Sequence, residues 1–326
     1  MKQRLIAAAC CAAVILGGCQ PSSGLLNKYS EMELLTSSDV LSLVEPEKGE
    51  GFAADLAVVP VSDNDASVSD SAITTNAALL ICTNTQEALY YKNIYESLAP
   101  ASLTKLMTGL LVLKYGNMDD IITITPDMVD ITVPGAQMAG FAAGDQVNVR
   151  DLFYSMLIYS GNDTSTALGI YISGSVEEFA DLMNSEAASL GAANTHFVNA
   201  CGLDADGHET CAYDLYLMFN ACMEYEEFRD AISQSSYTVN YTSASGAPVS
   251  KTFETTNLYF AGEYTPPEGV TVFGGKTGTT DNAGACLILS TTDDLGNSYI
   301  ALILGGDGKP ELYQQMSSLL LMIQKN

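Results

Sequence analysis

Basic residues are scarce in this chain of 326 residues, which has 13 lysines and arginines against 39 aspartates and glutamates. The formal net charge is −26. Nucleic-acid binding requires a basic surface that neutralises phosphates, so this composition argues against a nucleic-acid partner. The hydrophobic content of 47% supports a globular protein with a sizeable core.

The N-terminal apolar run is short. Residues 5–16 follow the basic start Met1-Lys2-Gln3-Arg4 and are too few to span a membrane stably, but they have the pattern of a secretory signal. The run ends in Leu16-Gly17-Gly18-Cys19, which resembles a bacterial lipobox, in which the cysteine is lipidated. We therefore expect a lipoprotein signal peptide over residues 1–18 and an extracytoplasmic protein anchored to the bacterial cell membrane through Cys19. The alternative is an ordinary cleaved signal.

Cysteines that could form a disulfide framework are also lacking. Of the eight cysteines, three lie in the first 19 residues, and the other five are Cys82, Cys201, Cys211, Cys222 and Cys286. An odd number outside the cytoplasm does not make such a framework, so buried free thiols are expected. A bridge between Cys201 and Cys211 stays open.

Residues 19–75 lack sustained hydrophobic periodicity and are rich in serine, aspartate and glutamate. This composition predicts a flexible acidic tether. Residues 76–326 should form the folded domain, and they contain no internal repeat.

The folded domain has strand patterns at both ends and helical patterns between them. Residues 77–83 and 88–92 are expected to be strands early in the chain, and residues 271–280, 285–292 and 298–304 late in it. The helical patterns cover residues 149–159, a segment up to about residue 172, residues 176–190, residues 213–223 and a stripe near the C-terminus. This order predicts an α+β fold, a five-stranded antiparallel sheet flanked by helices with an inserted helical lobe.

The first candidate catalytic residues lie in the stretch Pro100-Ala101-Ser102-Leu103-Thr104-Lys105, which begins an apolar helical pattern. Residues three apart share one face of a helix, so Ser102 and Lys105 should point the same way. A serine hydroxyl becomes nucleophilic when a base takes its proton, and a desolvated lysine can be that base. An isolated Ser-x-x-Lys is more often a helix cap with a solvated lysine.

Two further motifs follow in the chain. Ser160-Gly161-Asn162 lies on a turn between two expected helices, and Lys276-Thr277-Gly278 lies on a glycine-flanked strand. Each alone fits a helix cap or a strand with a surface lysine. Together with Ser102 and Lys105 they form, in order, the motif set of serine β-lactamases and penicillin-binding proteins.

These motifs make the chain, from about Asn76 onward, similar to the low-molecular-mass penicillin-binding proteins that act as serine-type D-alanyl-D-alanine carboxypeptidases. The resemblance also covers residues 149–152, 159–163, 195–199, 202–203, 208–215 and 275–284, and it includes loop positions that have no catalytic role. The resemblance implies the β-lactamase/DD-peptidase-like fold, removal of the terminal D-Ala from peptidoglycan stem pentapeptides, and inhibition by β-lactam antibiotics. It implies no metal and no organic cofactor.

The resemblance also assigns roles to residues of the acylation machinery. Ser102 would attack the D-Ala–D-Ala carbonyl, and Lys105 would be its base, with a pKa lowered by burial or by nearby Lys276. Ser160 would relay a proton to the leaving amine, and Asn162 would hold Lys105 and the substrate amide.

The same resemblance assigns substrate binding to the late glycine-rich strand. Lys276, with Thr277 and Thr279, would bind the substrate's free carboxylate. The backbone N–H groups of Ser102 and Thr279 would form the oxyanion hole. Gly278 and the glycines before Lys276 would let a peptide approach the strand edge closely.

Three alternatives stay in view. A class A β-lactamase would need a Glu-x-x-x-Asn pattern, and Glu177, Glu178 and Glu186 lack the asparagine. A zinc site could use two histidines and two cysteines, although their spacing does not match a common zinc pattern; they are His196, Cys201, His208 and Cys211. A non-catalytic, penicillin-binding wall sensor or scaffold is the third, against which the intact motif set argues.

One departure from the family pattern concerns the C-terminus. Many members carry a β-rich domain and an amphipathic membrane anchor after the catalytic domain, whereas here two expected strands and one helix follow Gly278. The apolar stripe of that helix fits packing on the sheet better than lying on a membrane. We therefore expect the lipid on Cys19 and the tether to replace this anchor.

Overall fold

The computed structural model describes residues 56–57 and 72–325, which belong to a compact unit, Asp55–Asn326. The expected signal peptide, Cys19 and most of the expected tether lie outside the described residues. Within the part that is described, no helix is long and apolar enough to cross a membrane.

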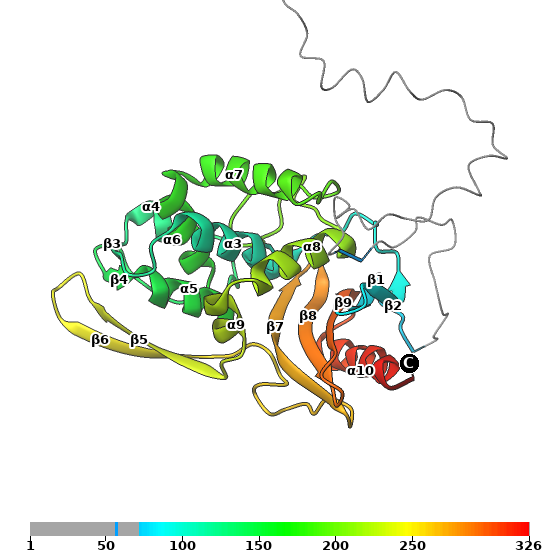
Figure 1. The fold of residues 1–326 in the computed structure, drawn as a ribbon. Helices are drawn as coiled ribbons and strands as arrows, with labels where there is room; N and C mark the ends of the chain where they lie inside the picture. The colour runs from blue at the N-terminus through cyan, green and yellow to red at the C-terminus, as the bar shows by residue number, and fades with distance from the viewer. Residues whose placement is uncertain (1–55, 58–71, 326) are drawn as a thin grey trace, which may run out of the picture. The chain divides into compact units, whose positions relative to one another are not determined.

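A five-stranded antiparallel sheet organises the domain and confirms the fold predicted from the sequence (Figure 1). Its order is β2-β1-β9-β8-β7. The strands are β1 (Ala77–Cys82), β2 (Glu87–Lys92), β7 (Val270–Thr280), β8 (Gly284–Asp293) and β9 (Ser298–Gly306). Because β1 pairs with β9, the two ends of the domain close one sheet, and β7 is left as an edge strand.

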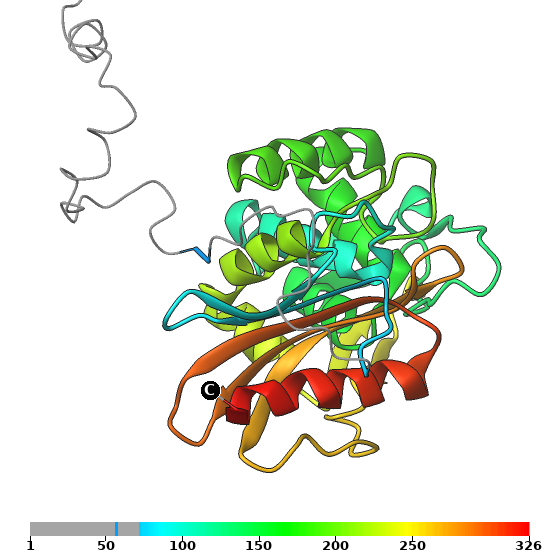
Figure 2. The ribbon, with the colours of Figure 1, turned by 90° about the vertical axis from the view of Figure 1, so that its right-hand side faces the viewer.

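The central strands are buried on both faces, which explains their nearly continuous apolar sequences. Side chains alternate along β1, so that Leu79 and Ile81 enter the larger core while Leu80 and Cys82 enter the smaller one. The larger core lies under the helical lobe, and the smaller one lies under α10 (Lys309–Leu320) on the opposite face (Figure 2).

The inserted lobe is helical, as expected from the sequence. Its elements are η1 (Ala101–Thr104), α3 (Lys105–Tyr115), α4 (Pro126–Val129), α5 (Val149–Ile158), α6 (Asn162–Ser173), α7 (Val176–Ser189), α8 (Ala212–Met223) and α9 (Glu226–Ile232). Outside the lobe, η2 (Leu321–Lys325) follows α10 and ends the described chain. Local chemistry sets several boundaries. The Asn148 and Ser175 side chains cap α5 and α7, and Gly174 ends α6 in a left-handed conformation.

A second sheet, with the order β3-β4-β5-β6, was not foreseen from the sequence. It consists of β3 (Ile121–Thr123), β4 (Gln146–Asn148), β5 (Ser236–Thr242) and β6 (Pro248–Glu254). The β5–β6 hairpin extends away from the main sheet (Figure 1). Inward and exposed positions alternate along β5, where Val239 is buried and Tyr237 and Tyr241 pack against the larger core.

Residues upstream of β1 also pack on the domain. The backbone N–H of Ala57 donates to the Tyr216 hydroxyl, and the Tyr213 hydroxyl donates to the Ala57 carbonyl at 2.8 Å. Thr74 and Thr75 donate their backbone N–H groups to the Gln315 side chain. The packed structure therefore includes residues of the segment that the sequence assigns to the tether.

Candidate active site

Ser102 lies in the short helix η1, directly before α3 begins at Lys105. The residue before it, Ala101, has a φ of 46°, which is unusual for a residue with a side chain. The expected side-by-side placement is present: the Nζ atom of Lys105 lies 3.0 Å from the Oγ atom of Ser102.

Lys105 is completely buried and has three close oxygen neighbours. Besides Ser102, its Nζ atom lies 2.7 Å from Oδ1 of Asn162 and 2.5 Å from the carbonyl oxygen of Cys201. The last two oxygens can only accept hydrogen bonds. The three contacts suit an ammonium ion, and the neutral amine, which has two N–H groups and one lone pair, can donate to both of these oxygens and direct its lone pair at the Ser102 hydroxyl.

The electrostatics of the site make that neutral amine more accessible than in an ordinary lysine. Burial lowers the pKa of Lys105 to about 8, while the charges of Cys201 and Asp163 act in the opposite direction. The sequence offered two causes for such a shift, burial or Lys276; burial is the one that lowers it, and Lys276 is not among the causes.

Ser160 lies in the turn between α5 and α6, and Asn162 is the first residue of α6. Ser160 has a φ of 68°, so its backbone is left-handed as well, and its hydroxyl accepts a hydrogen bond of 2.8 Å from Nζ of Lys276. Sparsely populated backbone conformations persist only where their surroundings enforce them, and they cluster at functional sites.

The buried carboxylate of Asp163 helps to hold the backbone near Ser160 in place. It accepts backbone N–H bonds of 2.7 Å from both Ala139 and Gly140, and one of 3.0 Å from Thr164. These bonds fasten the start of α6 to the preceding loop, and they hold Asn162 beside Lys105.

Lys276 projects from β7 into the same space and is also buried. Burial, and to a lesser extent the charge of Lys105, lower its pKa well below the ordinary range. Its neighbour Thr277 shares a hydrogen bond of 2.6 Å with Thr256. The Thr279 hydroxyl donates to the Gly278 carbonyl.

Gly278 brings the strand close to the nucleophile. A Cβ atom at this position would lie 3.0 Å from the backbone nitrogen of Ser102 and 3.0 Å from Cβ of Ala101. The absent side chain thus allows β7 and η1 to touch, next to the N–H group of Ser102.

A cavity of about 140 Å³ opens at these residues. Ser102, Ser160 and residues 277–279 line it, together with residues that the sequence did not single out, which are Gln137, Thr256, Cys286, Lys309, Leu312 and Tyr313. Lys309 begins α10, where a cation opposes the helix dipole. That placement is the one sequence signal that could have drawn attention to it.

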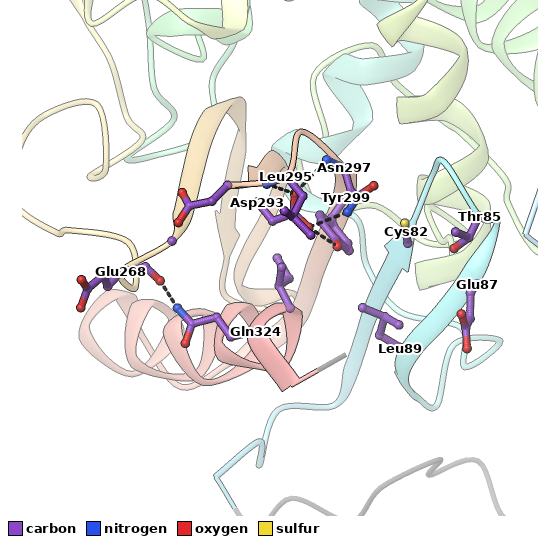
Figure 3. Close-up of a pocket in the computed structure, with 13 residues that line it drawn as sticks. Cys82, Thr85, Glu87, Leu89, Glu268, Asp293, Leu295, Asn297, Tyr299 and Gln324 are labelled. Carbon is purple, nitrogen blue, oxygen red and sulfur yellow. Dashed lines mark hydrogen bonds between the residues drawn. The ribbon is translucent and has the colours of Figure 1, made fainter.

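A larger cavity, of about 560 Å³, lies elsewhere (Figure 3). It is found at the β8–β9 turn, where Asp293 pairs with Val270 at the end of β7 remote from Lys276. Glu87, Glu268 and Asp293 are among its lining residues. Asp293 accepts hydrogen bonds from Asn297 and Tyr299, so it stabilises the turn.

The four candidate zinc ligands have other partners. His196 bonds the Gly207 carbonyl, and His208 bonds the Thr104 hydroxyl and the backbone N–H of Val198. The Cys201 thiol bonds Asn199, and the Cys211 sulfur accepts the backbone N–H of Asp214 at the start of α8. In the described residues no three metal-ligating side chains come together. The five cysteines of the domain are all buried and unbridged there, as expected.

Comparison with solved structures shows where this architecture occurs. The Streptomyces K15 DD-transpeptidase superposes with a TM-score of 0.70 at 26% identity, covering 78% of this chain and 98% of that one. Penicillin-binding protein D2 from Listeria monocytogenes, in its cefotaxime-bound form, gives a TM-score of 0.63 at 29% identity and 77% coverage of this chain. The fold is thus that of the DD-peptidase class.

The chain belongs to the D-alanyl-D-alanine carboxypeptidase family, peptidase family S11, whose sequence profile matches residues 64–308. It is 34% identical to D-alanyl-D-alanine carboxypeptidase DacF of Bacillus subtilis over 249 residues, which are 75% of this chain and 60% of that protein. It is 33% identical to DacD of Escherichia coli over 254 residues, 74% of this chain and 61% of that protein. The chain thus spans about three fifths of these curated relatives.

Proposed function

We propose that this protein is a serine DD-carboxypeptidase that removes the terminal D-Ala from peptidoglycan stem pentapeptides through an acyl-enzyme on Ser102. The observation that carries the proposal is the bonding of Lys105. Its amine has two acceptor-only partners and a third contact, 3.0 Å long, with the Ser102 hydroxyl. A neutral amine held in this way is a base aimed at the nucleophile.

Acylation follows from this arrangement. Lys105 takes the proton of Ser102 as its oxygen attacks the carbonyl carbon between the two D-alanines. The oxyanion that forms accepts hydrogen bonds from the backbone N–H groups of Ser102 and Thr279. The C–N bond then breaks, and the leaving amine takes a proton from the Ser160 hydroxyl. The proton that Lys105 took from Ser102 passes to the Ser160 oxygen, so Lys105 is neutral again for deacylation.

Substrate binding uses the free edge of β7. An extended peptide can add to this edge as a further strand. Its terminal carboxylate meets Lys276 and Thr277, and the negative charge raises the lowered pKa of Lys276 so that the amine binds as a cation. Lys309, at the rim of the same cavity, adds a second positive charge.

Deacylation repeats the same steps with water as the nucleophile. Lys105 takes a proton from the water, the ester bond to Ser102 breaks, and the serine oxygen regains a proton. We also propose that β-lactams acylate Ser102, because their strained amide presents a carbonyl next to a carboxylate, as the peptide does.

The lining of the cavity favours a peptidase over a class A β-lactamase. Among the described residues that line it, none is a carboxylate that could activate a deacylating water. Glu186, one of the three glutamates in the relevant region, is buried and forms an ion pair of 2.7 Å with Lys114. The intact, buried lysine also argues against a purely non-catalytic sensor, because binding alone does not require a proton acceptor.

The direct test supplies the purified domain with a pentapeptide ending in D-Ala–D-Ala and measures free D-Ala. We expect release by the wild-type protein and none by Ser102→Ala. Rapid penicillin hydrolysis without D-Ala release would instead indicate a β-lactamase. A chain that binds penicillin without either reaction would be a sensor.

We further propose that the protein is lipidated on Cys19 and acts outside the cytoplasm, tethered to the cell membrane. The support is the lipobox-like sequence that ends at Cys19 and the acidic segment after it. Cells fed a labelled fatty acid should label the wild-type protein and not Cys19→Ala. Equal labelling of the two proteins would rule out this anchor.

A further inference from the structure

The left-handed conformation of Ala101, directly before the nucleophile, is held by a directed chain of hydrogen bonds. The first of them joins the Thr104 hydroxyl to the Ala101 carbonyl oxygen at 2.9 Å. Both residues are completely buried. A carbonyl fixed in this way fixes the peptide plane between Ala101 and Ser102, and the N–H group of Ser102 belongs to that plane.

His208 provides the second bond. Its Nδ1 atom accepts the backbone N–H of Val198 at 2.9 Å, so the ring proton must reside on Nε2. Nε2 lies 2.9 Å from Oγ1 of Thr104 and therefore donates to it. The Thr104 proton is then directed to Ala101, so all three bonds run in one direction.

The neutral ring that this chain requires agrees with its surroundings. Burial lowers the pKa of His208 to about 4. Interactions with His196 and Lys105 act in the same direction, and Asp204 opposes them. The ring also packs against Phe197, with centroids 5.8 Å apart. Its position is thus fixed by packing as well as by hydrogen bonds.

Gly202 confines the same carbonyl from another direction. A Cβ atom there would lie 1.8 Å from the Ala101 oxygen and 2.9 Å from the Thr104 hydroxyl oxygen. Ala101 is therefore enclosed between the Thr104–His208 pair and the backbone of the loop that follows Cys201. That loop also supplies the carbonyl which holds Lys105.

We propose that Thr104 and His208 are positioning residues, which aim the N–H group of Ser102 at the developing oxyanion by locking the Ala101–Ser102 peptide plane. This inference rests on the proposed acyl-enzyme mechanism. It gives His208, which the sequence suggests only as a structural histidine or a metal ligand, a defined part in transition-state stabilisation. Neither residue lines the cavity at Ser102.

The test measures acylation of Ser102 by a chromogenic cephalosporin in Thr104→Val, Thr104→Ser and a matched control. The control is Ser155→Ala, because Ser155 is also completely buried and its hydroxyl also donates to the carbonyl three residues earlier, that of Leu152. A misdirected oxyanion donor typically slows the reaction about 10²-fold. We expect this loss in Thr104→Val, with little change in the apparent binding constant, and near wild-type rates in Thr104→Ser and Ser155→Ala.

A second variant keeps the proposal testable if Thr104→Val folds poorly. His208→Leu breaks the same chain one bond further away, and it should slow acylation to a similar extent. Because both residues act through one carbonyl, the double variant should be little slower than either single variant. Melting temperatures separate this effect from instability, since Ser155→Ala loses an equivalent bond.

The outcomes distinguish the inference from the function on which it rests. If the wild-type protein is not acylated, the proposed function fails. If it is acylated and Thr104→Val reacts as fast as Ser155→Ala, the positioning role is wrong. Multiplicative losses in the double variant would also contradict a single chain.

Discussion

Lys276 and Ser160, which are 116 residues apart in the chain, meet through a hydrogen bond of 2.8 Å between Nζ and Oγ. The lysine belongs to the edge strand of the main sheet, and the serine belongs to a turn of the helical lobe. The bond therefore links the sheet to the helical lobe at the active site. It leaves the Ser160 proton available for a leaving group, because the serine oxygen accepts from Lys276.

The first prediction concerns the pH dependence of acylation. Only neutral Lys105 can accept the Ser102 proton, and its pKa lies at about 8. Below that pH the protonated fraction grows, so kcat/KM should fall about tenfold per pH unit, and above it the rate should level off. The measurement is the acylation rate from pH 6 to 9.5.

Lys114→Arg is the control for this profile, because it retains the cation that pairs with Glu186 far from the nucleophile. The control should keep the same ascending limb as the wild-type protein. A rate that stays flat across pH 8 would contradict the role of Lys105 as base.

The second prediction concerns Lys276. Replacing it by glutamine removes the cation that meets the terminal carboxylate, and a charge-assisted hydrogen bond contributes about 1.5–3 kcal/mol. We expect kcat/KM for a peptide acid to fall at least tenfold. The corresponding peptide amide, which lacks the charge, should be affected much less. An equal loss for acid and amide would show that Lys276 does not recognise the carboxylate.

The third prediction compares two glycines. A Cβ atom at Gly275 would lie 2.2 Å from the Ile288 carbonyl oxygen, so Gly275→Ala must separate β7 from β8 and should destabilise the domain by about 2–3 kcal/mol. A Cβ atom at Gly109, inside α3, would make only ordinary contacts of 3.5 Å or more. Gly109→Ala should therefore stabilise the domain by up to about 1 kcal/mol. Chemical denaturation measures both. Equal effects would mean that β7 tolerates a side chain at this edge.

Much of this site was predictable because its chemistry is carried by residue type. The hydroxyl and amine groups and their spacing identify the catalytic candidates Ser102, Lys105, Ser160 and Lys276. The five strands are recognisable from their continuous apolar runs. The carbonyl of Cys201 could not be found in this way. Every residue has a carbonyl, and only the folded loop brings this one to Lys105.

The remaining gaps have similar physical causes. The pairing of β5 with β4 joins segments that are far apart in the sequence, so local patterns do not show the second sheet. The protonation of Lys105 depends on complete burial, which arises from elements distant in sequence. His208 attracts attention as a possible metal ligand, whereas its two hydrogen bonds tie together segments that the sequence does not show to be neighbours.

The most direct test of the central claim is the site and rate of covalent penicillin attachment. The purified protein is mixed with benzylpenicillin, and the intact mass and the proteolytic fragments are determined at timed intervals. We expect one adduct per chain, located on Ser102, absent in Ser102→Ala and formed orders of magnitude more slowly in Lys105→Gln. An adduct on another residue, or an unchanged rate without the amine of Lys105, would contradict it.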